Sequence, residues 1–414
     1  MRYVEHHWVP APFYDAGRGT TQVAIKLVVL LLAAMVTCPL QLPGGVAGLR
    51  TTEFVNIAAS AALVLALLSG SAVHRAAVPL SIAALLTIPW IWAEFISISM
   101  MVGSSPPRYA LARWILGLAT AYWIVVLMND DRYRRIVGTG FILGLLLSLA
   151  TVGYDAMTFD PTVPLVLTPD EEDNLASRWG QDGAYRAAGI FLHPNAAASV
   201  GLLLVPLVIG LVEERRLPRA TLILAALAVG FVFVTTQTRG ASGVATALLL
   251  WSLLRGSAAR KAVMAVVLLQ ILGVGSLLGL LPLDAVLDRF SDTTAATENL
   301  SGRFATTIGS FELAIANPLG LGSRYLTLLY DLTGFSSTHN AYMQLALLGG
   351  LPLAIYVTAR LLLQAFAPTV PTRVTESWVA TYMAGVFFFE NLFFSQTIIL
   401  FTLWLLYRPV RHQE

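Results

Sequence analysis

The sequence predicts an all-α integral membrane protein with about 12 transmembrane helices and a large external loop region that contains short helices. Of its 414 residues, 57% are hydrophobic and only 12% are charged, against about 25% charged residues in ordinary soluble domains. Apolar segments of roughly 20 residues, the length that a helix needs to cross ~30 Å of hydrocarbon, recur along the chain. Their evenly apolar character favours helices over the alternating strands of a barrel.

The apolar segments and the breakers between them place each span in turn. The last two spans are the hardest to separate, because only the polar pairs at 390–391 and 395–396 interrupt the apolar run. The expected spans lie near residues 22–41, 54–73, 77–101, 110–128, 134–153, 187–212, 220–235, 241–254, 261–281, 340–362, 377–395 and 396–407.

Basic residues fix the orientation of the spans, because cytoplasmic loops of membrane proteins carry an excess of lysine and arginine. With the N-terminus inside, most of the 26 basic residues fall on the inner side, many of them in the short loops 213–219 and 255–261. Both termini are therefore expected in the cytoplasm, within a single polytopic membrane domain of residues 1–414. Two long segments, 154–186 and 282–338, are expected outside, and the second is expected to carry part of a functional site.

Composition disfavours several classes of protein. The net charge is only +2, which argues against a nucleic-acid binder, because the basic residues of such a protein form a dense patch. Cys38 is the only cysteine, so no internal disulfide can form, and the polar N-terminal segment lacks the cleavage site of a removable signal peptide. The acidic run 170–173 has no histidines at ligand spacing, so no metal site is predicted. We find no internal repeat, which disfavours many transporter architectures.

The second external segment contains a predicted amphipathic helix that lies along the membrane or covers a cavity. Ser301 is expected to cap this helix and Arg303 to occupy its first turn, where side chain and helix dipole would both attract an anion. The run Asn-Pro-Leu-Gly-Leu-Gly at 317–322 is expected to end it. The apolar stripe consists of residues at helical spacing, Phe304, Ile308, Phe311 and Ile315.

The segment that opens the sixth span carries a proline between polar side chains. In one interpretation Pro194 kinks a helix, and His193 and Asn195 hydrogen-bond to neighbouring residues. In the other, the interruption frees the backbone and aims Arg186 at a binding pocket, since intramembrane polar residues often mark sites. The sequence leaves both interpretations open.

Two further arginines fall near the same external face. Arg239 closes a short turn between the seventh and eighth spans, where hydroxyls and an amide stand beside its guanidinium. It is either an arginine that reaches the lipid headgroups or a ligand of phosphate oxygens, to which helix-terminal N–H groups would add. Arg303 is the second arginine, and Arg289 and Arg324 are weaker candidates in the same segment.

His339 is the histidine best placed to act as a base. It begins the tenth span beside Asn340, and it either holds the helix end or accepts a hydroxyl proton, since its unperturbed pKa is about 6.5. Glu390 falls within an apolar span, where an unpaired carboxylate is costly, so we expect it to orient His339 or an arginine. For the same reason Glu94 is expected to pair with Arg113.

Cations gathered at one membrane face suit an anionic, membrane-borne substrate. Outside the cytoplasm no nucleotide supplies energy, so a synthetic enzyme there needs a donor that is already activated. A polyprenyl-diphosphate glycan fits, because arginines would hold its diphosphate through charge-assisted bonds of about 1.5–3 kcal/mol each. These bonds would strengthen as the leaving group gains charge.

In these residues the chain resembles the O-antigen ligase superfamily, which includes O-antigen and exopolysaccharide polymerases. The resemblance implies a multi-helical glycosyltransferase of the bacterial inner membrane whose active site faces a periplasmic loop region. In the ligases, glycan passes from undecaprenyl diphosphate to a sugar of lipid A-core without a required metal or cofactor. The matching pieces, in the order of the family, are Arg186 with 189–195 (Gly-Ile-Phe-Leu-His-Pro-Asn), 238–241 (Thr-Arg-Gly-Ala), 301–303 (Ser-Gly-Arg), 317–322 and 339–344 (His-Asn-Ala-Tyr-Met-Gln).

The resemblance also implies roles for single residues. Arg239 and Arg303 match arginines that bind the donor diphosphate, Arg186 matches a further external arginine, and His339 matches the general base. We therefore expect an inverting O-antigen ligase. The alternatives are an O-antigen or exopolysaccharide polymerase that uses a second lipid-linked repeat as acceptor, a transferase acting on a protein hydroxyl, and a lipid-linked anion transporter or flippase. The expected supporting residues are His193, Asn195, Asn340 and Glu390.

Overall fold

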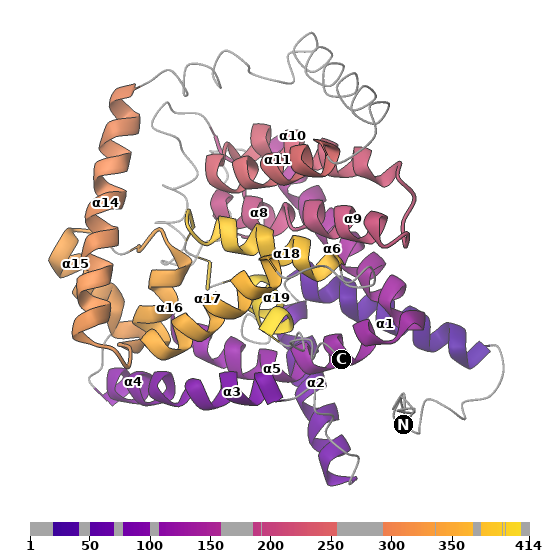
Figure 1. The fold of residues 1–414 in the computed structure, drawn as a ribbon, viewed down its shortest axis with the longest axis horizontal. Coiled ribbons are helices and arrows are strands. Elements are labelled where there is room, and N and C mark those ends of the chain that lie inside the picture. Colours follow the sequence, from indigo (N-terminus) through magenta and orange to yellow (C-terminus); the bar gives the residue numbers. More distant parts are fainter. Residues whose placement is uncertain are drawn as a thin grey trace.

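The computed structural model is a bundle of helices (Figure 1). It describes residues 20–40, 50–69, 78–99, 107–158, 185–191, 193–254, 293–335, 337–366, 374–390, 392–393 and 395–406. Within these ranges the regular secondary structure is helical throughout, which confirms the expected all-α class. The predicted span at 261–281, the acidic run 170–173, Arg289 and Asn391 lie outside the described residues.

The helices follow the predicted spans, and three of those spans are divided in two. The divisions fall at Thr87, at residues 202–203 and at Gly350. In chain order the helices are α1 Thr20–Thr37, α2 Thr51–Leu68, α3 Val78–Leu86, α4 Ile88–Ser99, α5 Pro107–Asn129, α6 Asp131–Thr158, η3 Gly189–Phe191, α8 Pro194–Gly201, α9 Leu204–Glu213, α10 Thr221–Thr236, α11 Arg239–Leu254, α14 Thr293–Ala316, η4 Gly322–Arg324, α15 Tyr325–Thr333, α16 Ala341–Gly349, α17 Leu351–Phe366, α18 Val374–Val386 and α19 Gln396–Leu406.

Length and composition allow several of these helices to cross a membrane. In the described ranges, 5 helical stretches are long and apolar enough, and six shorter apolar helices have 10–17 residues. The total of about 12 spans therefore stays a prediction. The five long stretches are Thr51–Leu68, Val78–Ser97, Ala110–Asn129, Asp131–Thr158 and Pro194–Glu213.

A buried ion cluster holds one end of the bundle, which we call the charged end. Arg134 of α6 lies there between two carboxylates: its Nη2 is 2.8 Å from Glu214 Oε1 and 2.7 Å from Glu376 Oε2. Its Nη1 also donates to the carbonyl of Met128. These bonds fasten the start of α6 to the end of α9 and the start of α18, so three separate segments share one anchor.

We expect Arg134→Met to lower the free energy of unfolding by about 3–5 kcal/mol, because it leaves two buried carboxylates without their counter-ion. Thermal unfolding of the purified protein, followed by tryptophan fluorescence, measures the change. Arg216→Ala is the matched control, since Arg216 pairs with Asp131 on the surface and such pairs contribute about 0–1 kcal/mol. Equal effects of the two substitutions would contradict the anchor.

The opposite end, which we call the site end, is where α6, α10 and α18 end and α8, α11 and α16 begin. The N–H of Ala187 donates to Thr235 O at 2.9 Å, and that of Ala341 donates to Phe387 O at 2.8 Å. The threading that assigned the charged loops and the candidate cations to different membrane faces is consistent with this separation. Which end faces the periplasm stays a prediction.

The run 317–322 ends α14, as expected, and lies against the break between α16 and α17. Leu351 N donates to Pro318 O at 2.8 Å. Gly320 and Gly350 both have left-handed backbones, with φ of 90° and 92°, and a Cβ on Gly320 would lie 2.7 Å from the nitrogen of Gly350. Two glycines therefore allow backbone to meet backbone where the tenth predicted span is broken.

The predicted pairing of Glu94 with Arg113 is wrong. Glu94 accepts hydrogen bonds from Ser323 Oγ at 2.7 Å and from Trp90 Nε1 at 3.2 Å. Arg113 instead forms an ion pair with Glu53 on α2, with 3.0 Å between Arg113 Nη2 and Glu53 Oε1. The buried Glu94 carboxylate thus finds its partner on η4, far along the chain, and fastens the segment after α14 to α4.

Helix α14 begins earlier than predicted. It starts at Thr293, so Ser301 is not its N-cap and Arg303 lies in its interior. The argument that the helix dipole adds to Arg303 is therefore wrong, because the dipole acts within the first turn. The side chains of Ser301 and Arg303 lie outside the described ones.

The same helix stands at one side of the bundle, at a steep angle to α10 and α11 (Figure 1), and packs on α15 and α16. Its packed face contains small residues, Thr306, Gly309, Ser310 and Ala314. The predicted apolar stripe is exposed. This surface is suited to hydrocarbon and unsuited to water.

Candidate functional site

One carboxylate of α6 anchors the segment that carries Arg186. Asp155 Oδ2 accepts hydrogen bonds from the N–H groups of Ala188 and Gly189, both at 2.8 Å. The hydroxyl of Tyr185 donates to the other oxygen of this carboxylate at 2.8 Å. Residues on both sides of Arg186 are thus fixed to α6, so the direction of its side chain is set by the bundle.

The guanidinium of Arg186 braces the turn between α10 and α11. Its Nε donates to Thr236 O at 3.0 Å, and its Nη2 donates to Asn195 Oδ1 at 2.7 Å. The hydroxyl of Thr238 donates to the same amide oxygen at 3.1 Å. Arg186, Asn195 and Thr238 therefore form one hydrogen-bonded group directly before Arg239.

His193 caps α8, and Pro194 begins this helix. His193 Nδ1 accepts a hydrogen bond from Asn195 N at 3.1 Å. Pro194 stands in the first turn, where its missing N–H costs nothing. The interpretation of Pro194 as a kink is therefore wrong, because Pro194 begins α8 and, of the described residues 185–191 and 193 before it, only η3 is helical. Arg186 itself does not lie in a helix.

Arg239 is the first residue of α11, and its side chain is exposed. The next residue, Gly240, touches the turn after α18: a Cβ there would lie 2.7 Å from Phe389 Cβ and 3.5 Å from Glu390 Oε1. Glycine alone allows this contact. It places the Glu390 carboxylate at the start of α11, where the helix dipole favours negative charge.

His339 precedes α16 with a left-handed backbone, φ 48°. This conformation is uncommon for a residue other than glycine and is often found at functional sites. Asn340 caps α16, since its Oδ1 accepts from Met343 N at 3.1 Å. The bond from Ala341 N to Phe387 O then ties this helix start to the turn after α18.

The turn at 387–390 joins the two main candidate groups. It binds the start of α16 through Phe387 and packs on the start of α11 through Phe389. The structure therefore brings Arg239 and His339 to one end of the bundle, with Arg186 beside Arg239. Among the described residues, no three His, Cys, Asp or Glu side chains form a metal-binding group.

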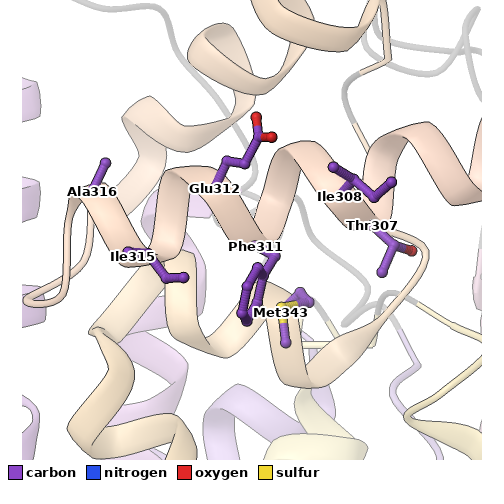
Figure 2. Close-up of a pocket in the computed structure, with 7 residues that line it drawn as sticks. All are labelled: Thr307, Ile308, Phe311, Glu312, Ile315, Ala316 and Met343. Carbon is purple, nitrogen blue, oxygen red and sulfur yellow. The ribbon is translucent and has the colours of Figure 1, made fainter.

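A cavity of about 620 Å³ lies along α14 beside the site end. In Figure 2, Phe311 of α14 stands next to Met343 of α16. Met343 is the residue whose N–H is capped by Asn340, so the cavity begins one helical turn from His339. Its lining is largely apolar and consists of Thr307, Ile308, Phe311, Glu312, Ile315, Ala316 and Met343.

Sequence reasoning missed three parts of this site. Asp155 carried a signal that could have found it, namely a carboxylate at the external end of an apolar span. Thr238 was noted as a hydroxyl of the turn and as part of the matching piece 238–241, but its bond to Asn195 was not predicted. Phe387 and Phe389 carried no signal, because phenylalanine in an apolar run is typical of any membrane helix.

A double-mutant cycle can separate bracing from diphosphate binding by Arg186. If Arg186 acts only as a brace, Asn195→Ala and Arg186→Ala should each slow glycan transfer by about tenfold, and the double variant by no more than either, because both act through one group. Transfer rates of the three purified variants measure this. A much larger loss in Arg186→Ala than in Asn195→Ala would instead indicate direct contact with the substrate.

The fold and the site define a polytopic helical membrane protein with arginines and a histidine gathered at one end of its bundle. Residues 196–358 match the family model described as O-antigen ligase, which confirms the resemblance to the O-antigen ligase superfamily. The matched segment includes Arg239, Arg303 and His339 and begins just after Asn195. No curated protein matches the chain. The match supports glycan transfer of the ligase or polymerase type as the general activity.

Proposed function

We propose that this protein is an O-antigen ligase of the bacterial inner membrane. It would transfer glycan from undecaprenyl diphosphate to a sugar hydroxyl of lipid A-core on the periplasmic side. One observation carries the proposal: the start of α11 with Arg239 and the turn with His339 pack against the same residues, 387–390. An anion-binding group and a base thus stand on either side of one turn.

The chemistry follows from these positions. The guanidiniums of Arg239 and Arg303 hold the diphosphate, and Arg186 supports Arg239 or adds a third contact. His339 takes the proton of the acceptor hydroxyl while the oxygen of that hydroxyl forms the new bond to the anomeric carbon. The bond from that carbon to the diphosphate breaks with its electron pair, and the configuration inverts. The arginines stabilise the charge that the diphosphate gains.

The cavity along α14 supports a lipid-linked donor. It is largely apolar and begins one helical turn from His339, so a polyprenyl chain could lie there while its diphosphate reaches Arg239. Burial of apolar chain contributes ~0.8 kcal/mol per methylene group, which favours a lipid carrier over a soluble sugar phosphate.

Reconstitution tests this function. Purified protein in lipid nanodiscs is supplied with lipid-linked glycan from the producing cells and with lipid A-core, and the products are separated by gel electrophoresis. Glycan on lipid A-core supports the ligase. Longer lipid-linked polymer without capped lipid A-core indicates the polymerase, glycosylated protein indicates a protein acceptor, and movement of intact donor between leaflets of vesicles without bond formation indicates a flippase.

A further inference from the structure

Two exposed aromatic rings stand in the turn after α18. Phe387 is fully buried, whereas Phe388 and Phe389 are 61% and 44% exposed. Glu390, the next residue, is buried again. The two rings are therefore presented outward from a turn whose first and last residues are held inside the bundle.

Each of the two phenylalanines packs on a residue close in sequence to one of the two groups that would act on the substrate. Phe389 packs on Gly240, next to Arg239, with its Cβ 2.7 Å from the place of a Cβ on that glycine. Phe388 packs on Tyr342 of α16 with ring centroids 5.1 Å apart, and Tyr342 follows His339 by three residues. Phe389 therefore contacts the residue after Arg239, and Phe388 contacts the helix that follows His339.

The positions of the rings are fixed by their surroundings. The hydroxyl of Tyr342 donates to Ala384 O at 2.8 Å, and its ring meets both Phe387 and Phe388 edge to face. The bond from Ala341 N to Phe387 O holds the turn itself. Phe388 is therefore exposed but held in position by Tyr342, and such a preorganised ring loses little conformational entropy when a ligand binds.

We propose that Phe388 and Phe389 form a platform for the sugar of the donor that undergoes reaction. This inference rests on the proposed function. In the transfer, the anomeric carbon must lie between the leaving diphosphate and the attacking hydroxyl, which is the space between Arg239 and His339. The C–H face of a pyranose carries slight positive charge and packs on the negative face of an aromatic ring. The rings also keep water away from the anomeric carbon.

Kinetics of Phe388→Leu and Phe389→Leu test the platform. We expect the KM for lipid-linked glycan from the producing cells to rise roughly three- to tenfold in each variant, and hydrolysis to increase relative to transfer. Inhibition by undecaprenyl diphosphate, which has no sugar, should keep its wild-type value. Phe388→Tyr retains a ring and should restore the wild-type KM.

Phe366→Leu is the matched control, since Phe366 is an exposed phenylalanine, 80% exposed, at the last residue of α17. Wild-type KM in both platform variants would overturn the inference, as would an equal weakening of glycan and undecaprenyl diphosphate, which would assign the rings to the lipid chain. In either case wild-type transfer stands and the proposed function survives. If the wild-type protein transfers no glycan, the proposed function fails and the platform fails with it.

Discussion

His339→Asn is expected to reduce glycan transfer by roughly 10²–10⁴-fold, the usual contribution of a general base. Asparagine tolerates the left-handed backbone that this position adopts, φ 48°, so the fold should survive while the imidazole is lost. The rate of transfer by purified protein, measured against pH, checks the result. A general base acts in its unprotonated form, so wild-type activity should rise with pH, and this rise should be absent in the variant.

A second substitution at the same position separates catalysis from strain. Alanine removes the imidazole and also disfavours the left-handed backbone, at a cost of about 1–2 kcal/mol. His339→Ala should therefore unfold at a lower temperature than His339→Asn and be equally inactive. A variant of either kind that keeps its activity, or a wild-type rate that does not rise with pH, would contradict the role of base.

Arg239→Ala is expected to lower the transfer rate by about 10²–10³-fold, because it removes charge-assisted bonds to the leaving diphosphate. The side chain is exposed, so the substitution should change the unfolding temperature only slightly. Arg239→Lys should recover only part of the rate, since an ammonium keeps the charge and loses the planar fork. Single-turnover rates with saturating donor measure the loss.

The control for Arg239 is Arg132→Ala. Arg132 is an arginine of the charged end whose side chain is 63% exposed, so its loss changes the net charge equally without touching the site. If both substitutions slow transfer alike, the effect belongs to the overall charge of the protein. If neither does, the diphosphate is held elsewhere.

Much of the fold could be predicted because its signals are local. Hydropathy places most helices within a few residues, and the proline and glycines at 317–322 mark the end of α14. The start of α14 was predicted wrongly at Ser301 because that prediction relied on the apolar stripe, whereas the helix extends back through polar residues to Thr293. Residues 293–300 carry no large apolar residues at regular helical spacing, so the sequence gives no periodic signal there.

The partners of buried charges could not be predicted in the same way. Glu94 seemed nearest to Arg113 in the threaded chain, but it bonds to Ser323, because packing chooses partners across long sequence separations. The site shows both cases. His193 and Asn340 stand at helix starts that the sequence marks, whereas the turn that unites Arg239 with His339 is made of phenylalanines that resemble ordinary lipid-facing residues.

Two backbone hydrogen bonds join the two ends of the segment that contains His339. Leu321 N donates to Leu347 O at 2.6 Å, and Leu351 N donates to Pro318 O at 2.8 Å. The segment between these two bonds contains α15, His339 and the start of α16. Helix α16, which follows His339, is therefore fixed at its start by the bond to Phe387 and at its end by these two bonds.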